Sequence, residues 1–178
     1  MPLDEVLPDL FVSGLNSTKR SILEENEIKT VLTIREYPNP FEPNCDILYH
    51  HIGISDTSDQ DLSQHFQNIT DIISSGLQQG KVLVHCQGGM SRSVSGIIAY
   101  MVSVFNIDYQ TALKIMRENH RTSFPNSGFA GQLERWAEQT KSSWEPTPAY
   151  IYHKDRILEP DNMKKFQTIK SILKKRKK

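Results

Sequence analysis

The chain has 178 residues, of which 21 are Lys or Arg and 21 are Asp or Glu, so its formal net charge at neutral pH is zero. This length suits one domain built on a single hydrophobic core. No apolar run approaches the roughly 20 residues of a membrane-spanning helix, and the N-terminus lacks the basic and apolar regions of a secretory signal, so we expect an intracellular protein, cytoplasmic or nuclear, without a transmembrane segment.

The two cysteines, Cys45 and Cys86, are too few for a disulfide framework and offer no zinc-ligand spacing. We therefore expect free thiols in a reducing compartment, with no metal and no other cofactor.

Strands and helices are expected to alternate along the first half of the chain. The apolar runs, the turn residues and the helix caps predict the following elements: a strand at Leu10–Ser13, a helix at Ser17–Glu25, a strand at Val31–Ile34, a proline-containing loop over residues 35–46, a strand at Leu48–Ile54 and a helix at Ser63–Leu77.

The second half begins with Val82–Val84, which is apolar on every side and therefore suits a central strand covered on both faces. Apolar residues spaced at threes and fours then predict three helices, at residues 92–105, Tyr109–Asn119 and Gly128–Thr140. Strands that alternate with helices predict an α/β sandwich with a mainly parallel sheet.

The composition changes near residue 141. Residues 1–140 carry 10 basic and 17 acidic side chains, whereas residues 141–178 carry 11 and 4. We expect one domain over residues 1–141 and a basic C-terminal tail over residues 142–178, partly helical or disordered.

Within that tail, Met163, Phe166, Ile169 and Ile172 recur at intervals of three after Pro160, which predicts a helix. A run of five basic residues, 174–178, follows. Three interpretations stay open: a patch that contacts import machinery or anionic surfaces, a solvated disordered end, or a segment that docks on the acidic body of its own domain.

The stretch "VLVHCQGGMSRS" carries the strongest chemical signal. A strand that enters a glycine-containing turn and then a helix points several backbone N–H groups into one concavity, which binds anions. The same field stabilises the thiolate of Cys86. Arg92 can grip two oxygens of a tetrahedral anion, and the residues between them would wrap a phosphate: Gln87, Gly88, Gly89, Met90 and Ser91.

Neighbouring residues complete this interpretation. Ser93 could donate its hydroxyl to the sulfur of Cys86 when that sulfur leaves, and His85 would brace the loop by hydrogen bonding. Burial statistics alone would make Cys86 a small core residue, but a core role does not explain Arg92 at the start of a helix. A nucleotide loop is disfavoured because neither GxGxxG nor GxxxxGK[ST] occurs.

The segment "HCQGGMSRS" resembles the signature of cysteine-dependent protein tyrosine phosphatases, and specifically their dual-specificity branch, although that branch most often has Ala where Gly88 stands. The segments "LPDLFVSG", "ISDTSDQDL", "IIAYMV" and "PNSGFAGQL" resemble the same branch, over about residues 5–140. The resemblance implies the phosphotyrosine protein phosphatase II type of fold, a five-stranded and mainly parallel sheet flanked by helices.

The resemblance also implies a two-step reaction through a phosphocysteine. Asp56 occupies the position of the family's general acid in "D-T-x-x-x-x-L" and would later act as a base. Asp59 and Asp61 are the alternatives nearby, and Asp61 suits a cap for the helix at Ser63. Asn126 matches a family position that orders the loops around the site, but it could equally be a turn residue.

The expected function is a protein phosphatase that acts on phosphotyrosine, phosphoserine and phosphothreonine, with phosphorylated proteins as partners. The short chain suggests a shallow cleft and a small, atypical member without a kinase-docking domain. Alternatives are a phosphatase for a phosphoinositide, RNA 5′-phosphate or glycan, and a scaffold that binds phosphorylated partners without turnover. Oxidation of the Cys86 thiolate is a further expectation, for which Cys45 could serve as a resolving thiol.

Overall fold

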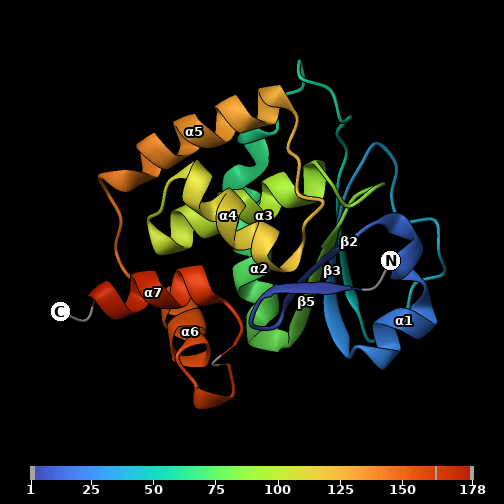
Figure 1. The fold of residues 1–178 in the computed structure, drawn as a ribbon. Helices are drawn as coiled ribbons and strands as arrows, with labels where there is room; N and C mark the ends of the chain where they lie inside the picture. Colours follow the sequence, from blue (N-terminus) through green and yellow to red (C-terminus); the bar gives the residue numbers. More distant parts are fainter. Residues whose placement is uncertain (1–2, 163, 177–178) are drawn as a thin grey trace.

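A central sheet in the order β1-β2-β5-β3-β4 organises the computed structural model, which describes residues 3–162 and 164–176 (Figure 1). Its strands are β1 (Asp4–Leu7), β2 (Leu10–Ser13), β3 (Ile28–Ile34), β4 (Leu48–Ile52) and β5 (Lys81–His85). β1 runs antiparallel to β2, and the other neighbours pair in parallel. The predicted α/β architecture with a mainly parallel five-stranded sheet is confirmed.

Strand β5 occupies the middle of the sheet. Val82 pairs with Leu10 of β2 on one side and Thr30 of β3 on the other. The side chains of Val82–Val84 are completely buried, as expected for an apolar strand covered on both faces. The residue that follows β5 therefore leaves the sheet at the carboxyl edge of three parallel strands.

Helices cover both faces of the sheet (Figure 1). The larger core lies against α2 (Phe66–Gln79), α3 (Arg92–Phe105), α4 (Tyr109–Asn119) and α5 (Ser127–Lys141), and a smaller cluster lies under α1 (Arg20–Glu25). The predictions for α3 and α4 match the observed bounds. Those for the other helices differ by one to three residues, because capping turns extend or precede them.

Several elements of the first part depart from the predictions, among them β3, which begins at Ile28, three residues before the predicted start at Val31. β1 was not predicted, because its sequence DEVL is short and half polar. The helix expected from Ser17 is a 3-10 turn at Leu15–Thr18 followed by α1, since Lys19 adopts an extended backbone between them. β4 ends at Ile52, two residues before the predicted end.

The chain beyond residue 141 forms two helices, α6 (Pro148–Ile157) and α7 (Gln167–Arg176), which lie together at the end of the molecule opposite α5 (Figure 1). Buried apolar side chains of these helices, and of the residue just before α7, join the main core. These are Tyr150, Ile157, Phe166, Ile169 and Leu173.

Polar contacts also hold this segment. Tyr100 of α3 shares a hydrogen bond of 2.7 Å with buried His153, and Tyr152 donates to Asp9 in the β1–β2 turn at 2.5 Å. Burial lowers the pKa of His153 to about 3, so its ring is neutral at physiological pH. The predicted domain boundary at residue 141 stays a prediction. Buried side chains of α6 and of α3 belong to the same hydrophobic core.

The helix predicted from Met163 begins at Gln167. Met163, Lys177 and Lys178 lie outside the described residues. Among the helices that are described, none is both long and apolar enough to cross a membrane.

Candidate active site

Cys86 lies in the loop between the end of β5 and the start of α3, and its side chain is buried. The sulfur accepts a hydrogen bond from the backbone N–H of Gly89 at 3.2 Å and lies 3.2 Å from the hydroxyl of Ser93. A thiolate is stabilised by donors of this kind together with the N-terminus of the following helix. Ser93 thus occupies the place that its predicted role requires.

Glycine is required at position 89 of this loop. Its φ of +71° lies in the left-handed region, and a Cβ there would approach the backbone N of Gly14 to 2.7 Å. The N–H of Leu15 donates to the carbonyl of Gln87 at 3.0 Å, so the segment that follows β2 supports the loop. At Gly88, by contrast, the nearest atoms to an added Cβ are 4.0 Å away. The alanine that the dual-specificity branch usually has there would fit.

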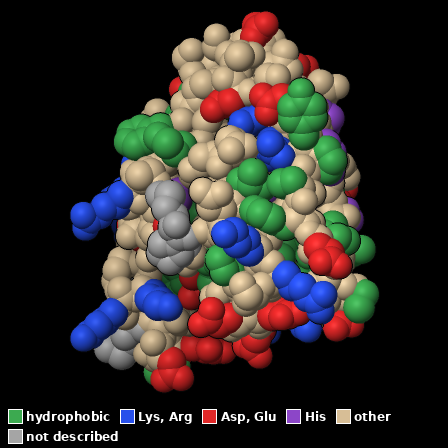
Figure 2. All heavy atoms as spheres, turned by 90° about the vertical axis from the view of Figure 1, so that its right-hand side faces the viewer, with side chains coloured by type: hydrophobic (Ala, Val, Ile, Leu, Met, Phe, Trp, Pro, Cys, Tyr) green, Lys and Arg blue, Asp and Glu red, His purple; other side chains and the backbone are tan. Residues whose placement is uncertain are grey.

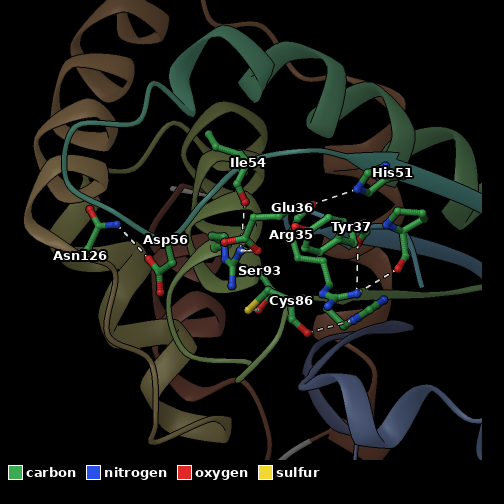
Figure 3. Close-up of polar contacts among 12 residues, drawn as sticks. Arg35, Glu36, Tyr37, His51, Ile54, Asp56, Cys86, Ser93 and Asn126 are labelled. Carbon is green, nitrogen blue, oxygen red and sulfur yellow. Dashed lines mark hydrogen bonds and ion pairs between the residues drawn. The ribbon is translucent and has the colours of Figure 1, made fainter. Parts of the chain in front are cut away.

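The guanidinium of Arg92 is buried and only partly satisfied. Its Nη1 donates to the carboxylate of Glu36 at 2.6 Å and to the carbonyl of Ile54 at 3.0 Å (Figure 3). Its Nε has no hydrogen-bond partner among the described residues. Because an unmade hydrogen bond at a buried donor costs about 1–3 kcal/mol, this edge of Arg92 is suited to an anionic ligand that completes it.

Glu36 was not identified from the sequence. It follows β3, and its carboxylate holds the position of Arg92. A hydrogen bond from its own backbone N–H, and next the one from Arg92, lower the pKa of Glu36 below its ordinary value. The signal that could have identified Glu36 is its position just after a predicted strand. Because β3 and β5 are parallel neighbours, the residues that follow these two strands meet at one edge of the sheet.

Asp56 and Asn126 meet across 70 residues of sequence: the Asn126 side-chain amide donates to the Asp56 carboxylate at 2.9 Å (Figure 3). The carbonyl oxygen of the same side chain caps α5 by accepting from Phe129, and the backbone N–H of Asn126 donates to Ser91. The contacts of Asn126 are compatible with both interpretations, and its role in ordering the site stays a prediction. Ser91, for which the sequence predicted no individual role, lies in the loop from Cys86 to Arg92, which we call the phosphate loop. Its hydrogen bond with Asn126 connects this loop to the N-cap of α5.

The backbone around Asp56 is also pressed against α5. A Cβ at Gly128 would come within 2.0 Å of the Ser58 carbonyl, so only glycine permits this approach. Asp61 accepts from the backbone N–H of Ser63 at 3.0 Å, but it precedes Leu62, the N-cap residue of the 3-10 turn at Ser63–His65, and is not itself the predicted cap. The carboxylate of Asp59 accepts from the hydroxyl of Thr57. Of these three acidic residues, Asp56 is the one whose hydrogen-bond partner, Asn126, also contacts the phosphate loop.

His85 braces the loop from inside the sheet. Its Nδ1 donates to the carbonyl of Cys86 at 3.1 Å, and its Nε2 accepts from the hydroxyl of Thr33 at 2.7 Å. Burial lowers the pKa of His85 to about 4. The ring is therefore neutral at physiological pH and bonds to the backbone of Cys86, as a bracing role requires.

The two cysteines lie at opposite ends of the sheet. Cys86 follows the carboxyl end of β5, whereas exposed Cys45 lines a cavity of about 720 Å³ together with Lys29 and Thr30 at the amino end of β3. A disulfide between Cys45 and Cys86 would require a large rearrangement, because bonded cysteines have Cα atoms about 4.4–6.8 Å apart.

Comparisons with known proteins place these residues in a family. The model described as "Dual specificity phosphatase, catalytic domain" matches residues 10–139. The chain is 38% identical to dual specificity protein phosphatase MPK-4 of Drosophila melanogaster over 137 residues, which cover 74% of this chain and 35% of that protein. It is 34% identical to dual specificity protein phosphatase 15 of Mus musculus over 143 residues, which cover 78% of this chain and 60% of that protein.

Among solved structures, the human tyrosine phosphatase-like serine/threonine/tyrosine-interacting protein superposes with a TM-score of 0.72 and 30% identity, covering 78% of this chain and 97% of that one. The family match includes Asp56, the whole of the loop from Cys86 to Arg92, and Asn126. The chain therefore belongs to the family of dual specificity phosphatase catalytic domains.

Proposed function

We propose that this protein hydrolyses phosphate monoesters of phosphotyrosine, phosphoserine and phosphothreonine in proteins, through a phosphocysteine. One observation carries the proposal: the Nε–H of buried Arg92 has no hydrogen-bond partner in the part of the chain that the structure describes, and Arg92 closes the same loop as the Cys86 sulfur, which already accepts a hydrogen bond. A phosphoryl group bound in the loop would complete Arg92 and present phosphorus to Cys86. The names of the two curated relatives support the same activity.

In the first step, the thiolate of Cys86 attacks phosphorus. A sulfur–phosphorus bond forms as the bond between phosphorus and the substrate oxygen breaks. Asp56 transfers its proton to that oxygen, so the product leaves as an alcohol or phenol. Arg92 and the loop N–H groups stabilise the charge on the phosphoryl oxygens.

In the second step, the ionised carboxylate of Asp56 takes a proton from water, and the water oxygen attacks phosphorus. The sulfur–phosphorus bond breaks and inorganic phosphate is released. Ser93, 3.2 Å from the sulfur, donates to the thiolate as it leaves. Asn126 fixes the Asp56 carboxylate through both steps by its hydrogen bond.

Proteins are the favoured substrates because the rim of the site is apolar. Met90 in the loop is 44% exposed, and Phe124, whose backbone N–H binds the Met90 carbonyl, is 54% exposed. The guanidinium of Arg117 stacks on the Phe124 ring at 4.9 Å. Figure 2 shows the face on the right of Figure 1, with separate groups of hydrophobic side chains in its upper part and basic side chains between them. Phosphopeptide side chains suit such a rim better than inositol phosphates, which need several cations around the loop.

The experiment compares the wild type with Cys86→Ser on an aryl phosphate, and then on phosphotyrosine and phosphothreonine versions of one peptide. Cys45→Ser is the matched control. The proposal predicts turnover of all three substrates by the wild type and the control, and none by Cys86→Ser. Faster turnover of a phosphoinositide or of RNA 5′-phosphate than of both peptides would favour the non-protein alternatives. Binding of peptides by the wild type without turnover would favour a scaffold.

A further inference from the structure

His120 lies after α4, outside every role described so far, yet its side chain is almost completely buried against the phosphate loop. Its Nε2 is 2.6 Å from the carbonyl oxygen of Gly89, and its Nδ1 is 2.6 Å from the carboxylate of Asp4 on β1. The imidazole thus bridges the edge strand of the sheet and the loop that surrounds Cys86.

The two oxygens at 2.6 Å from the ring, the Gly89 carbonyl and the Asp4 carboxylate, are acceptors, and the hydroxyl of Thr122 lies farther away, 3.3 Å from Nε2. A neutral imidazole has one N–H, so it can donate to Gly89 or to Asp4 but not to both. Its bare nitrogen would then face the other oxygen at 2.6 Å, which is repulsive. The doubly protonated ring donates to both oxygens and pairs with the Asp4 carboxylate. The Asp4 side chain is 31% exposed, so its carboxylate keeps contact with water.

This bridge constrains the backbone that would hold the phosphate. The Gly89 N–H is bound to the sulfur of Cys86, and the Gly89 carbonyl is bound to His120. In a trans peptide, the N–H points opposite to the carbonyl, so the Met90 N–H is turned away from His120. The left-handed φ of Gly89 permits this orientation. A charged donor on the carbonyl also polarises the peptide and strengthens the Met90 N–H as a donor.

We infer that His120, held as an imidazolium by Asp4, is a positioning residue that fixes the Gly89–Met90 peptide for oxyanion binding. The inference rests on the proposed function, and it adds a residue outside the family match, since Asp4 precedes residue 10. The next residue of β1, Glu5, pairs with Lys165 beyond the other end of that match. The residue before Glu5, Asp4, thus reaches the phosphate loop through His120 from a segment that precedes the family match.

The test measures tungstate binding by calorimetry in a Cys86→Ser background, and KM and kcat for an aryl phosphate with Cys86 intact. His120→Phe keeps the ring volume and removes both donors. We expect tungstate affinity to fall, and KM to rise, by a factor of about 10 to 100, the value of one hydrogen bond to a charged group. kcat should change less. His120→Gln, whose amide can donate to Gly89, should restore part of the affinity.

Two further variants separate this effect from a general loss of structure. Asp4→Asn, at a partly exposed position, should weaken tungstate binding in the same direction. Glu5→Gln, on the same strand, should leave it unchanged. Nitrogen NMR of the wild type at pH 7 should show both ring nitrogens of His120 protonated, and Asp4→Asn should remove that signature.

The outcomes distinguish this inference from the proposed function. A wild type that binds tungstate and hydrolyses the aryl phosphate, with unchanged affinity in both His120→Phe and Asp4→Asn, overturns the role of His120 alone. A neutral His120 ring at pH 7 in the wild type does the same. A wild type that neither binds nor hydrolyses overturns both claims. If His120→Phe fails to fold, the tungstate affinity of Asp4→Asn and the NMR measurement on the wild type test the role of His120 instead.

Discussion

Substituting alanine for Ile157 tests whether the C-terminal helices belong to the folding unit. Ile157 lies at the end of α6, is fully buried and is part of the main core. Truncating a buried isoleucine to alanine lowers the free energy of unfolding by about 2 to 5 kcal/mol, because apolar contacts are lost and a cavity remains. In a chain of this size, that corresponds to a melting temperature lower by roughly 4 to 20 °C.

The matched control is Ile151→Ala, on the same helix, where the side chain is 51% exposed. Its effect should stay within about 0.5 kcal/mol, as for most surface substitutions. Urea unfolding of the full chain, followed by circular dichroism, measures both variants. We expect one transition, shifted strongly by Ile157→Ala only. Equal shifts in the two variants, or a separate early transition for the C-terminal helices, would show that α6 is not part of the common core.

Three other outcomes are expected. Asp56→Asn should lower kcat by about 10²–10⁴-fold while tungstate affinity is retained, since a proton donor is lost but the anion site remains. Asp59→Asn is the control. If Asp56→Asn turns over substrate as fast as the wild type, another residue is the general acid. Gly89→Ala should abolish tungstate binding because of its positive φ and backbone clash, whereas Gly88→Ala should be tolerated; calorimetry of both variants decides. Finally, the folded-state pKa of His85 is lowered to about 4, so the unfolded chain binds more protons between about pH 6.5 and pH 4. The free energy of unfolding should fall with decreasing pH there, by about 1.4 kcal/mol per unit from this group. Urea titrations at several pH values should show a shallower slope in His85→Gln, and an unchanged slope would contradict the buried, neutral ring.

Much of the site could be predicted because its parts are close together in the chain. Cys86, Arg92 and Ser93 lie within eight residues, between a strand and a helix that the apolar pattern predicts well. In such a segment, the turn and the helix start place the side chains with little help from the rest of the fold. Asp56 needed the family resemblance, since its local sequence alone favours a turn or cap residue.

Tertiary structure decided the contacts between distant segments. Glu36 meets Arg92 across 56 residues, and Asp4 meets His120 across 116. These pairs depend on strand order and on where the segment after α4 lies, and neither leaves a periodic pattern in the sequence.

The sequence by itself predicted the chemistry that we propose for the phosphate loop, and it determined the alternation of strands and helices, because backbone propensity and apolar spacing act over a few residues. Only the packed structure decided that the polar strand β1 pairs with β2, that α6 and α7 join the core, and that His120 reaches the loop. Each of these depends on burying a surface that another part of the chain provides, and a short stretch of sequence does not contain that information.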